Sequence, residues 1–596
     1  MSYTSGMQAF VWLVIALFLP LKSLSAGSTI RTWWHSQSVQ TKGPISLWQV
    51  RSSSEYEVFV RPTNPSDSKG QPSFVYKSIP RNGEQQLPYG DQDGAEFAVS
   101  TNLSMNWTSF QYSADVFVDI RRQKPISPTS LVSIKPSFLN LSYEQIDSHT
   151  VRVRVPYRRM GYRISIEFDD DLYWSYSDPS FHGGLLNTAG VGARIHQEPR
   201  NALLIFAEDL DSFPAADDVA KNSETYFPLP GLIEPELWQG YRKIVFRTGV
   251  YYLAPQSHAF LPPSVTELYL EGGAYVKGSF EFQGREQSYS VSGLGVISGE
   301  IYPYEADRKN QYQRSNQGQC HGDCIKLLQF FSSKKPQQLR LEGITLANPP
   351  YHSFVVYGDS TSFAMTVSRF KQVGAWYWQT DGLELLDGSS MRHSFFHSND
   401  DVIKLYHSNL RISDIVVWKA ENGPVIQMGW VPRAIRNIKV NGIYVIHNRM
   451  YWNDQKHNHC LINSARHYLD SGSDNLADSS KTISDVTIDG VIAEGLQLCA
   501  LRLYLLGNLE SLTIKNLFVD AWNDLLYTSQ LSLLMPMTNP EGETVRIGSP
   551  MQPIGLQLRN YWVAGQRVSL ERDNWRYFQI GRLAFQTELS PYWYLD

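Results

Sequence analysis

The sequence lacks a surplus of basic residues and, beyond residue 26, any long apolar run. Its 53 Lys and Arg are outnumbered by 58 Asp and Glu, so the formal net charge is -5. Because such a chain has no excess cationic charge to neutralise a phosphate backbone, we expect no nucleic-acid partner. No later stretch approaches the roughly 18 apolar residues of a membrane-spanning helix. We therefore expect the mature chain to be soluble.

Cysteine is also scarce, with four residues in 596: Cys320, Cys324, Cys460 and Cys499. Four cysteines can pair in three ways. We favour Cys320–Cys324 and Cys460–Cys499 because each pair is local in the sequence, although the sequence does not decide between the pairings. A zinc site at 320–324 would need a second ligand cluster nearby, and the sequence offers none, so we predict no metal.

What the sequence does have is typical of a globular protein. Hydrophobic residues make up 42% and charged residues 19%, which excludes a disordered chain, and 596 residues predict two to four domains. Aromatic residues reach 13%, with 16 Trp and 33 Tyr. Aromatic rings either fill cores or stack against the C–H faces of sugars, and composition alone does not separate these two uses.

The N-terminus resembles a secretion signal. Residues 8–21 form an apolar run, and the small residues of 23–26 suit a cleavage site. We predict a signal peptide over 1–26 and an extracellular protein; an uncleaved anchor is the alternative. In a secreted chain, three Asn-x-Ser/Thr triplets become candidate glycan acceptors, at Asn102, Asn106 and Asn140.

The first half of the mature chain reads as short strands. Apolar and polar residues alternate in segments separated by Pro, Gly, Asn and Ser, as in half-buried strands without helices. The clearest segments are 56–61, 115–120, 150–155 and 162–168. We predict an N-terminal β-sandwich over 27–210. A stretch rich in Asp, Ala, Ser and Pro follows, and we expect a linker over 211–240.

A repeat marks the remainder. Its form is Φ-x-Φ-x-(Gly/Asn/Asp)-Φ-x-Φ, where Φ is apolar, and successive copies begin 71, 28, 48 and 26 residues apart. These intervals are about three, one, two and one steps of a period near 24 to 28 residues, which indicates stacked repeats. The copies lie at 339–346, 410–417, 438–445, 486–493 and 512–519.

A parallel β-helix over 241–596 explains this repeat best. Alternate residues would point inward, and Gly, Asn or Asp would occupy the bend where φ turns positive. Leucine-rich repeats would need consensus leucines and a helical half, and propeller blades a period of about 40 residues or more. Unrelated antiparallel strands stay open as an alternative.

Two acidic clusters in the repeat region are candidates for catalysis. Asp381 precedes Asp400 by 19 residues and Asp401 by 20, close to one short coil. Stacked strands lie about 4.8 Å apart, so these carboxyl groups could share a face at roughly 5 to 10 Å. That range overlaps the roughly 6.5 to 9.5 Å of inverting glycosidases, and close carboxylates raise each other's pKa. Turn-forming aspartates and a calcium site are the alternatives.

Residues around these aspartates suit a sugar site. Three bulky aromatics, 376–378, directly precede Asp381, and alternation must expose at least one of them; we choose Trp378. Lys404 and Tyr406 follow Asp401, and Trp430 falls about one coil later. Lys404 could bind sugar hydroxyls or keep a carboxylate ionised; an ordinary surface lysine is the alternative.

Together these segments resemble glycoside hydrolase family 49, which contains dextranases and isopullulanases. The resemblance runs in order through most of the mature chain, and as a set its motifs are specific. They occupy 32–35, 73–76, 79–83, 168–172, 249–251, 273–278, 295–300, 370–374, 379–382, 399–401, 403–406 and 427–430.

The resemblance implies an N-terminal β-sandwich followed by a right-handed parallel β-helix. It implies hydrolysis of α-glucosidic bonds with inversion, without metal or cofactor. By similarity Asp400 is the general acid, while Asp381 and Asp401 activate the attacking water. The substrate-contacting tryptophans of the family match Trp430 and, in the N-terminal domain, Trp34.

The chain also departs from the family pattern, most clearly over 302–324, and this leaves the cleaved linkage open. The residues near the aspartates look more like dextranase, so we favour endo-cleavage of α-1,6 bonds in dextran by a monomer. An isopullulanase that cuts α-1,4 bonds of pullulan is the alternative. Outside this class, a non-catalytic carbohydrate-binding β-helix is the main competitor. A polysaccharide lyase is disfavoured because few basic residues surround the aspartates to bind uronates.

Overall fold

The structure is a computed structural model. It describes residues 29–41, 43–63, 70–80, 103–177, 192–219, 222–283, 286–314, 320–333, 335–359, 361–451, 458, 460–466, 476–523, 532–551, 554–569, 579–580 and 593–595. In these ranges no helix is long and apolar enough to cross a membrane. The predicted signal peptide, 1–26, and the candidate glycan acceptor Asn102 lie outside the described residues.

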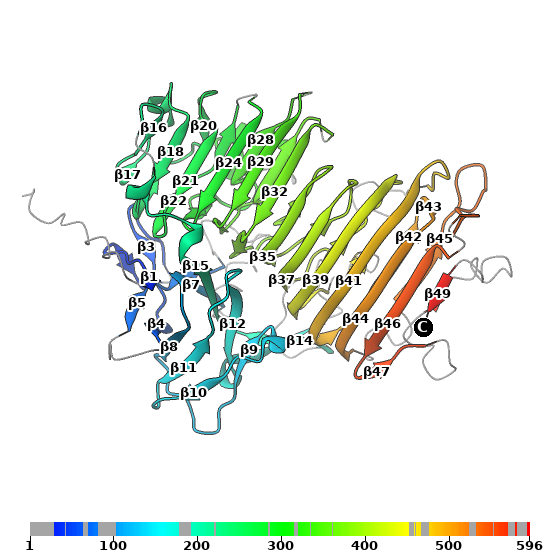
Figure 1. The fold of residues 1–596 in the computed structure, drawn as a ribbon, viewed down its shortest axis with the longest axis horizontal. Helices are drawn as coiled ribbons and strands as arrows, with labels where there is room; N and C mark the ends of the chain where they lie inside the picture. The colour runs from blue at the N-terminus through cyan, green and yellow to red at the C-terminus, as the bar shows by residue number, and fades with distance from the viewer. Residues whose placement is uncertain are drawn as a thin grey trace, which may run out of the picture.

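Two facing sheets form the predicted N-terminal sandwich, drawn in blue and cyan in Figure 1. Their inner faces bury alternate residues such as Val118, Val153, Ile164 and Ile205 in one core. One sheet contains β1 (Ile30–Arg31), β6 (Tyr76–Ser78), β7 (Ser104–Tyr112), β9 (Val132–Lys135), β12 (Tyr162–Phe168) and β15 (Asn201–Asp209). The other contains β4 (Tyr56–Pro62), β5 (Gln71–Ser73), β8 (Val116–Arg122), β10 (Tyr143–Gln145) and β11 (Thr150–Val155).

Smaller elements accompany these sheets. The paired strands are β2 (Ser38–Val39) with β3 (Val50–Arg51), β13 (Leu172–Tyr176) with β14 (Arg194–Pro199), and β26 (Ala306–Asp307) with β27 (Gln313–Arg314). Short 3-10 turns are η2 (Ser137–Leu139), η3 (Asp169–Asp171), η4 (Leu210–Ser212), η5 (Ala216–Asp218), η6 (Pro235–Trp238), η7 (Arg308–Asn310) and η8 (His321–Asp323).

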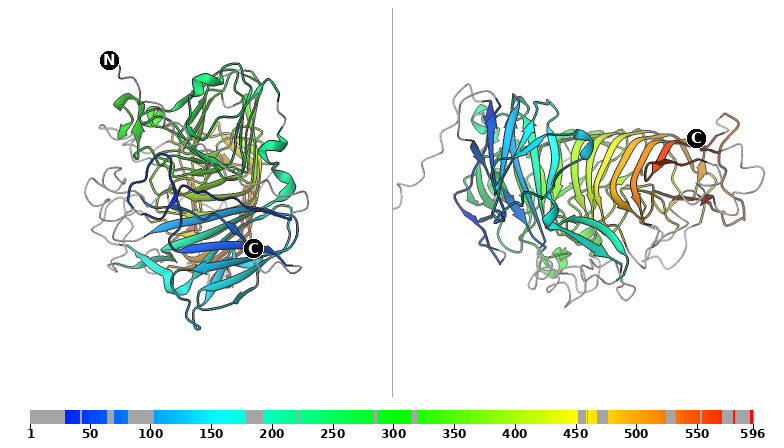
Figure 2. Two further views of the ribbon diagram at one scale, coloured as in Figure 1. Left: turned by 90° about the vertical axis from the view of Figure 1, so that its left-hand side faces the viewer. Right: turned by 90° about the horizontal axis from the view of Figure 1, so that it is seen from below.

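The rest of the chain winds into a parallel β-helix, which runs from green to red across Figure 1 and is seen from below in Figure 2. Its longest sheet contains β16 (Thr225–Tyr226), β17 (Gly231–Leu232), β18 (Lys243–Phe246), β19 (Gly249–Tyr252), β21 (Glu267–Leu270), β22 (Ala274–Lys277), β24 (Ser288–Gly293), β25 (Val296–Ser298), β29 (Gln337–Glu342), β30 (Thr345–Ala347), β32 (Phe363–Ser368), β33 (Lys371–Val373), β35 (Ser390–Ser398), β37 (Arg411–Lys419), β39 (Ile435–Asn448), β41 (Thr482–Gln497), β43 (Asn508–Leu509), β44 (Leu512–Trp522), β46 (Leu556–Val563), β47 (Gln566–Arg567) and β49 (Trp593–Leu595).

Two shorter parallel sheets complete the coils. The first contains β20 (Ala259–Leu261), β23 (Phe280–Phe282), β28 (Leu328–Phe331) and β31 (Phe354–Tyr357). The second, called the site sheet below, contains β34 (Leu383–Glu384), β36 (Ile403–Lys404), β38 (Ile426–Gln427), β40 (Ile462–Asn463), β42 (Leu501–Leu505), β45 (Ser532–Pro536) and β48 (Gln579–Ile580).

The sequence repeat corresponds to stacked positions in the long sheet. Ile412 of β37 pairs with Val440 of β39, which continues the stack to Ile488 of β41. The bend position has the predicted positive φ, for example 53° at Asp414 and 74° at Gly442. Short side chains or glycine tolerate this left-handed backbone, so the repeat was a correct prediction of coil geometry.

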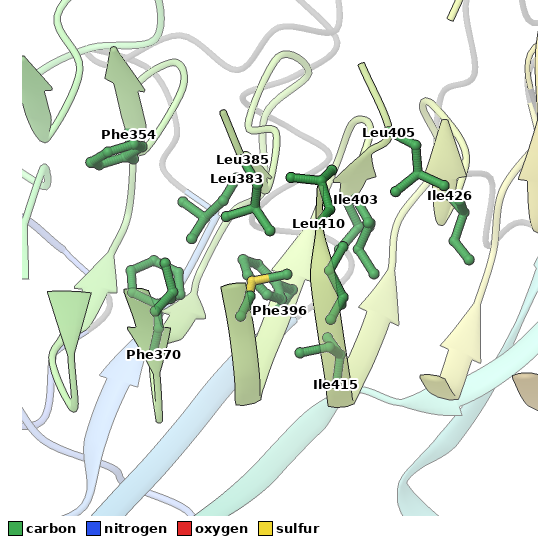
Figure 3. Close-up of a cluster of buried hydrophobic side chains, with 14 of the residues drawn as sticks. Phe354, Phe370, Leu383, Leu385, Phe396, Ile403, Leu405, Leu410, Ile415 and Ile426 are labelled. Atoms are coloured by element: carbon green, nitrogen blue, oxygen red, sulfur yellow. The ribbon is translucent and has the colours of Figure 1, made fainter. Parts of the chain in front are cut away.

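Apolar ladders fill the interior of the helix. Figure 3 shows this core near the site sheet, with Phe370 and Phe396 on one wall and Leu383, Ile403 and Ile426 on the facing one. Each of these five side chains is at most 1% exposed. Such burial contributes roughly 1.5 to 3 kcal/mol per large apolar side chain and fixes the register of neighbouring coils.

The sandwich packs on one outer face of the β-helix. Trp107 and Phe206 from the sandwich share an apolar cluster with Tyr275, Val416 and Trp418 from the long sheet. The predicted linker, 211–240, is not a free connection, because β16 and β17 within it pair in parallel with β18 and β19. They start the β-helix, and the short length of each strand hid the pattern.

One predicted glycan acceptor is wrong. Asn106 lies inside β7 with no solvent exposure, and its Nδ2 donates to Ser104 Oγ and the Ala202 carbonyl, both at 3.1 Å. A glycan has no path to this side chain. Asn140, in contrast, is exposed after η2 and stays a prediction.

Candidate active site

The site sheet brings the two acidic segments together. Asp381 and Asp401 each lie two residues before the first residue of a short strand, and those strands pair in parallel with Leu383 opposite Ile403. The Gly382 N–H donates to the Asp401 carbonyl at 2.8 Å. Parallel pairing in this register places the two aspartates at equivalent positions of successive coils. The predicted one-coil relationship is therefore present.

A third coil closes on the pair. Gly423, with φ of 71°, approaches so near that a Cβ there would lie 2.6 Å from the Asp401 nitrogen. Only glycine permits both this φ and this approach. The Val402 N–H, in turn, donates to the Pro424 carbonyl at 3.2 Å. The aspartates are thus held in backbone that three successive coils constrain.

One oxygen from each of Asp381, Asp400 and Asp401 lies within 4.8 Å of the others. This is shorter than the 5 to 10 Å that the coil spacing predicted. The three carboxyl groups consequently interact strongly through space.

Two neighbouring groups favour the ionised form of Asp381. Its Oδ1 lies 2.9 Å from His352 Nδ1, and its Oδ2 contacts Lys404 Nζ. Burial would raise the pKa of Asp381, but the charges of His352 and Lys404 and their hydrogen bonds hold it well below its usual range.

Asp400 has the opposite electrostatic environment. Burial, followed by the charges of Asp381 and Asp401, raises its pKa well above the usual range. Its Oδ2 accepts hydrogen bonds from Asn422 Nδ2 at 2.7 Å and from the Gln379 N–H at 3.1 Å. Asp400 therefore favours its protonated form, and its hydrogen bonds orient the carboxyl group, which suits a general acid.

Asp401 is intermediate between these two. Burial and the charge of Asp381 raise its pKa to about 7. Its Oδ1 accepts from Gln427 Nε2 and its Oδ2 from the Tyr406 hydroxyl, each at 3.3 Å. A carboxylate with a pKa close to neutral is suited to accept a proton from water.

The cluster also has the donor type of a cation site, since carboxylate oxygens are the ligands that Ca²⁺ prefers. Its residues suit that role poorly, because His352 and Lys404 already occupy both oxygens of Asp381. The arrangement is better described as three carboxyl groups in different protonation states, which can do acid–base chemistry.

The five predicted sugar-binding residues lie in different surroundings. Lys404 contacts Asp381, Tyr406 contacts Asp401, and Trp378 and Trp430 are half-buried beside these two segments. Trp34 lies on the sandwich and is 46% exposed, and its ring meets that of Phe74 edge to face with the centroids 5.4 Å apart. Sugar contact by all five residues stays a prediction.

Sequence reasoning missed the partners that orient the aspartates. His352, Asn422 and Gln427 each contact one of them, and Gln379 does so through its backbone. Gln427 could have been found, since it stacks in register on Lys404. The others depend on turns between coils, whose lengths the repeat does not fix.

The unusual segment 302–324 reaches the site. Its Tyr304 donates a hydrogen bond to Gln379 Oε1 and stacks on Tyr377 with ring centroids 5.0 Å apart. The structure contains both favoured disulfides, Cys320–Cys324 within this segment and Cys460–Cys499. Through Tyr304 the segment therefore packs against the turn before Asp381 and supports it.

Family models match several parts of the chain. A model of the glycosyl hydrolase family 49 N-terminal Ig-like domain matches residues 22–210, and one of glycosyl hydrolase family 49 matches 472–595. A β-solenoid repeat from dextranase matches 350–382, and an isopullulanase β-solenoid repeat matches 418–450.

Whole-length relatives agree. A dextranase from Arthrobacter globiformis is 44% identical over 584 residues, covering 96% of this chain and 91% of the relative. An isopullulanase from Aspergillus niger is 33% identical, with 84% of each chain covered. The solved structure of Dex49A from Penicillium minioluteum matches with a TM-score of 0.77 at 29% identity, covering 94% of this chain and 99% of that one.

Fold, site and relatives together define a glycoside hydrolase built on a parallel β-helix with an N-terminal Ig-like sandwich. The chain belongs to glycoside hydrolase family 49.

Proposed function

We propose that the protein is an endo-acting dextranase that hydrolyses α-1,6-glucosidic bonds with inversion. The observation that carries this proposal is a cluster of three carboxyl groups with contrasting partners: Lys404 and His352 at Asp381, and Asn422 at Asp400. Asp400 favours its protonated form and Asp381 its ionised form. Pairs of acids whose environments drive their pKa values apart are the usual basis for acid–base assignment.

In the proposed reaction Asp400 gives its proton to the glycosidic oxygen as the bond to the anomeric carbon breaks. A water held by Asp381 and Asp401 attacks that carbon from the opposite face and loses a proton to Asp401. The charge of Asp381, held by Lys404 and His352, orients the water and stabilises the developing positive charge on the sugar.

The short carboxylate spacing is compatible with a bound water. A water about 2.8 Å from two oxygens, at a near-tetrahedral angle, spans about 4.6 Å between them. The aspartate oxygens lie within 4.8 Å. Asp381 and Asp401 can therefore hold the nucleophile directly. The nearest oxygen of Asp400 is closer to them than the roughly 6.5 to 9.5 Å of inverting glycosidases, so the proposed inversion rests on the family and not on this spacing.

Dextran is favoured as the substrate because two dextranases, at 44% and 45% identity, resemble the chain more than the isopullulanase does at 33%. The isopullulanase repeat over 418–450 includes the turn next to Asp400 and keeps pullulan as a second candidate. Trp378, Trp430, Tyr406 and Trp34 are proposed sugar contacts.

Secretion is part of the proposal. The apolar N-terminal run fits a signal peptide, and two disulfides fit an oxidising compartment. We propose a monomer, since an α-glucan chain is the partner that this site requires.

The test compares the wild type with Asp400→Asn on dextran and pullulan side by side. The wild type should release isomaltose-type products from dextran, with the β-anomer first by proton NMR. The variant should lose on the order of 10² to 10⁴ in kcat. Isopanose from pullulan would select isopullulanase, an initial α-anomer would reject inversion, and a fully active variant would reject the acid assignment.

A further inference from the structure

A buried ion pair links the N-terminal domain, through its β13–β14 pair, to the β-helix. Glu198 lies on β14 and is 1% exposed; Arg449 follows β39 and is 4% exposed. Arg449 Nη1 donates to Glu198 Oε1, and Trp418 Nε1 donates to Glu198 Oε2 at 2.8 Å. Figure 1 shows β14 at the lower edge of β39 and β41.

The same arginine reaches toward the catalytic turn. Arg449 Nε donates to Glu421 Oε1 at 2.9 Å, and Glu421 Oε2 accepts from Asn399 Nδ2 at 2.8 Å. Glu421 is 3% exposed and Asn399 is fully buried. A continuous chain of hydrogen bonds therefore runs from the sandwich to the residue directly before Asp400.

Asn399 connects this chain of hydrogen bonds to the turn before Asp381 and to the carboxyl group of Asp400. Its Nδ2 also donates to the Trp376 carbonyl at 2.9 Å, which fixes the turn before Asp381. Its Oδ1 accepts the Asn422 N–H at 3.0 Å, and Asn422 Nδ2 donates to Asp400 Oδ2 at 2.7 Å. The acid carboxyl is thus held from its own backbone and through Asn422.

Burying two glutamates and an arginine here is unfavourable unless every group is hydrogen-bonded. The same interface also contains apolar clusters and a second buried ion pair, Glu208 with Lys371, so burial and charge alone do not distinguish the Glu198–Arg449 pair. What distinguishes it is the chain of hydrogen bonds that leads toward Asp400.

A buried ionic group can fix one conformation among several. From Glu421, only Asn399 and Asn422 lie on the hydrogen-bonded path to Asp400. This position indicates that the ionic group fixes the conformation of the Asp400 side chain.

We propose that Glu198 of the N-terminal sandwich and Arg449 of the β-helix are positioning residues that set the orientation of the Asp400 carboxyl through Glu421, Asn399 and Asn422. The sandwich is thereby part of the catalytic apparatus. This inference rests on the proposed function, in which Asp400 is the general acid.

The leaving group provides a specific test. A sugar leaving group needs a proton from the acid, whereas 4-nitrophenolate departs without one. A misplaced acid should therefore slow cleavage of dextran much more than cleavage of a 4-nitrophenyl α-isomaltoside. Loss of folded protein or of substrate binding would lower both rates alike.

The variants are Glu198→Gln and Arg449→Lys, measured beside Asp400→Asn. We expect kcat on dextran to fall about 10- to 100-fold, KM to change little, and the aryl substrate to lose less than about threefold. Arg449→Lys keeps the charge but cannot bridge both glutamates, so it carries the same test if Glu198→Gln does not fold.

Glu208→Gln is the matched control. Glu208 is also a fully buried sandwich glutamate that contacts a β-helix cation, Lys371 Nζ at 3.1 Å. Its other ion-pair partners among the described residues are Arg163 and Arg369, and neither contacts Asp400. It should leave the ratio of the two rates unchanged. Equal losses on both substrates for Glu198→Gln and Arg449→Lys, or the same ratio change in Glu208→Gln, would overturn the inference. Full activity of Asp400→Asn would instead overturn the proposed function.

Discussion

Two ladders of side chains in the site sheet lie one residue apart and behave in opposite ways. From β34 to β42 the inward ladder is apolar and buried: Leu383, Ile403, Ile426, Ile462 and Leu501. Over the same strands the outward ladder is polar: Glu384, Lys404, Gln427, Asn463 and Arg502. Because side chains alternate between the two faces of a strand, the polar residues that contact the aspartates lie next to core residues on the opposite face of the same sheet.

The two ladders depend on their neighbours to different degrees. An inward residue needs an apolar neighbour of suitable volume above and below. An outward residue needs one particular partner: Lys404 contacts Asp381, and Gln427 contacts Asp401. Changes to the inward ladder should therefore affect stability, and changes on the outward side should affect the reaction.

The largest effect is expected on the outward side, from Asp401→Asn. Without this base, kcat should fall on the order of 10² to 10⁴. The unfolding free energy of the variant at neutral pH should instead exceed that of the wild type. The folded-state pKa of about 7 exceeds the unfolded value, so ionised Asp401 destabilises the fold as pH rises above about 4.

The measurement is the melting temperature of both proteins across pH. At pH 7 Asp401→Asn should have a higher melting temperature than the wild type, and its unfolding free energy should be larger by on the order of 1 kcal/mol or more. Near pH 4 the two proteins should have the same melting temperature. A variant that is less stable at pH 7 would contradict the electrostatic account of this carboxyl.

The next largest effect is expected on the inward side, from Ile403→Ala. Removing these buried methyl groups between Leu383 and Ile426 should cost about 2 to 5 kcal/mol of unfolding free energy. Below its melting transition, the variant should keep nearly wild-type kcat. Denaturant unfolding checks the first point, and Ile403→Val, expected to lose only about 0.5 to 1.5 kcal/mol, is the graded control.

The smallest effect is expected from Lys404→Met. The positive charge of Lys404 lowers the pKa of Asp401, so its removal should raise that pKa. Because the base works only when ionised, the acid limb of kcat/KM should move to higher pH, on the order of one unit. Lys404→Arg, which keeps the charge, should leave the limb in place; an equal shift there would reject this explanation.

Strand alternation and the coil period were readable from the sequence because each is local. The segments at 150–155 and 162–168 coincide with β11 and β12, and the repeat at 438–445 lies within β39. The predicted linker contains the first coil strands, β16 and β17, because strands of two residues each are too short to show the repeat period. Asn106 matched a glycan motif, but its burial depends on the second sheet of the long-range fold.

The sequence by itself determined the coil period, the apolar ladders and the one-coil spacing of Asp381 and Asp401, since these follow from residue type and interval. Only the tertiary structure decided which carboxyl group favours its protonated form. That depends on His352 and Lys404 beside Asp381 and on the burial of Asp400 next to two other aspartates. Protonation is set by charges and burial in space, and turns of variable length bring those groups together from distant parts of the chain.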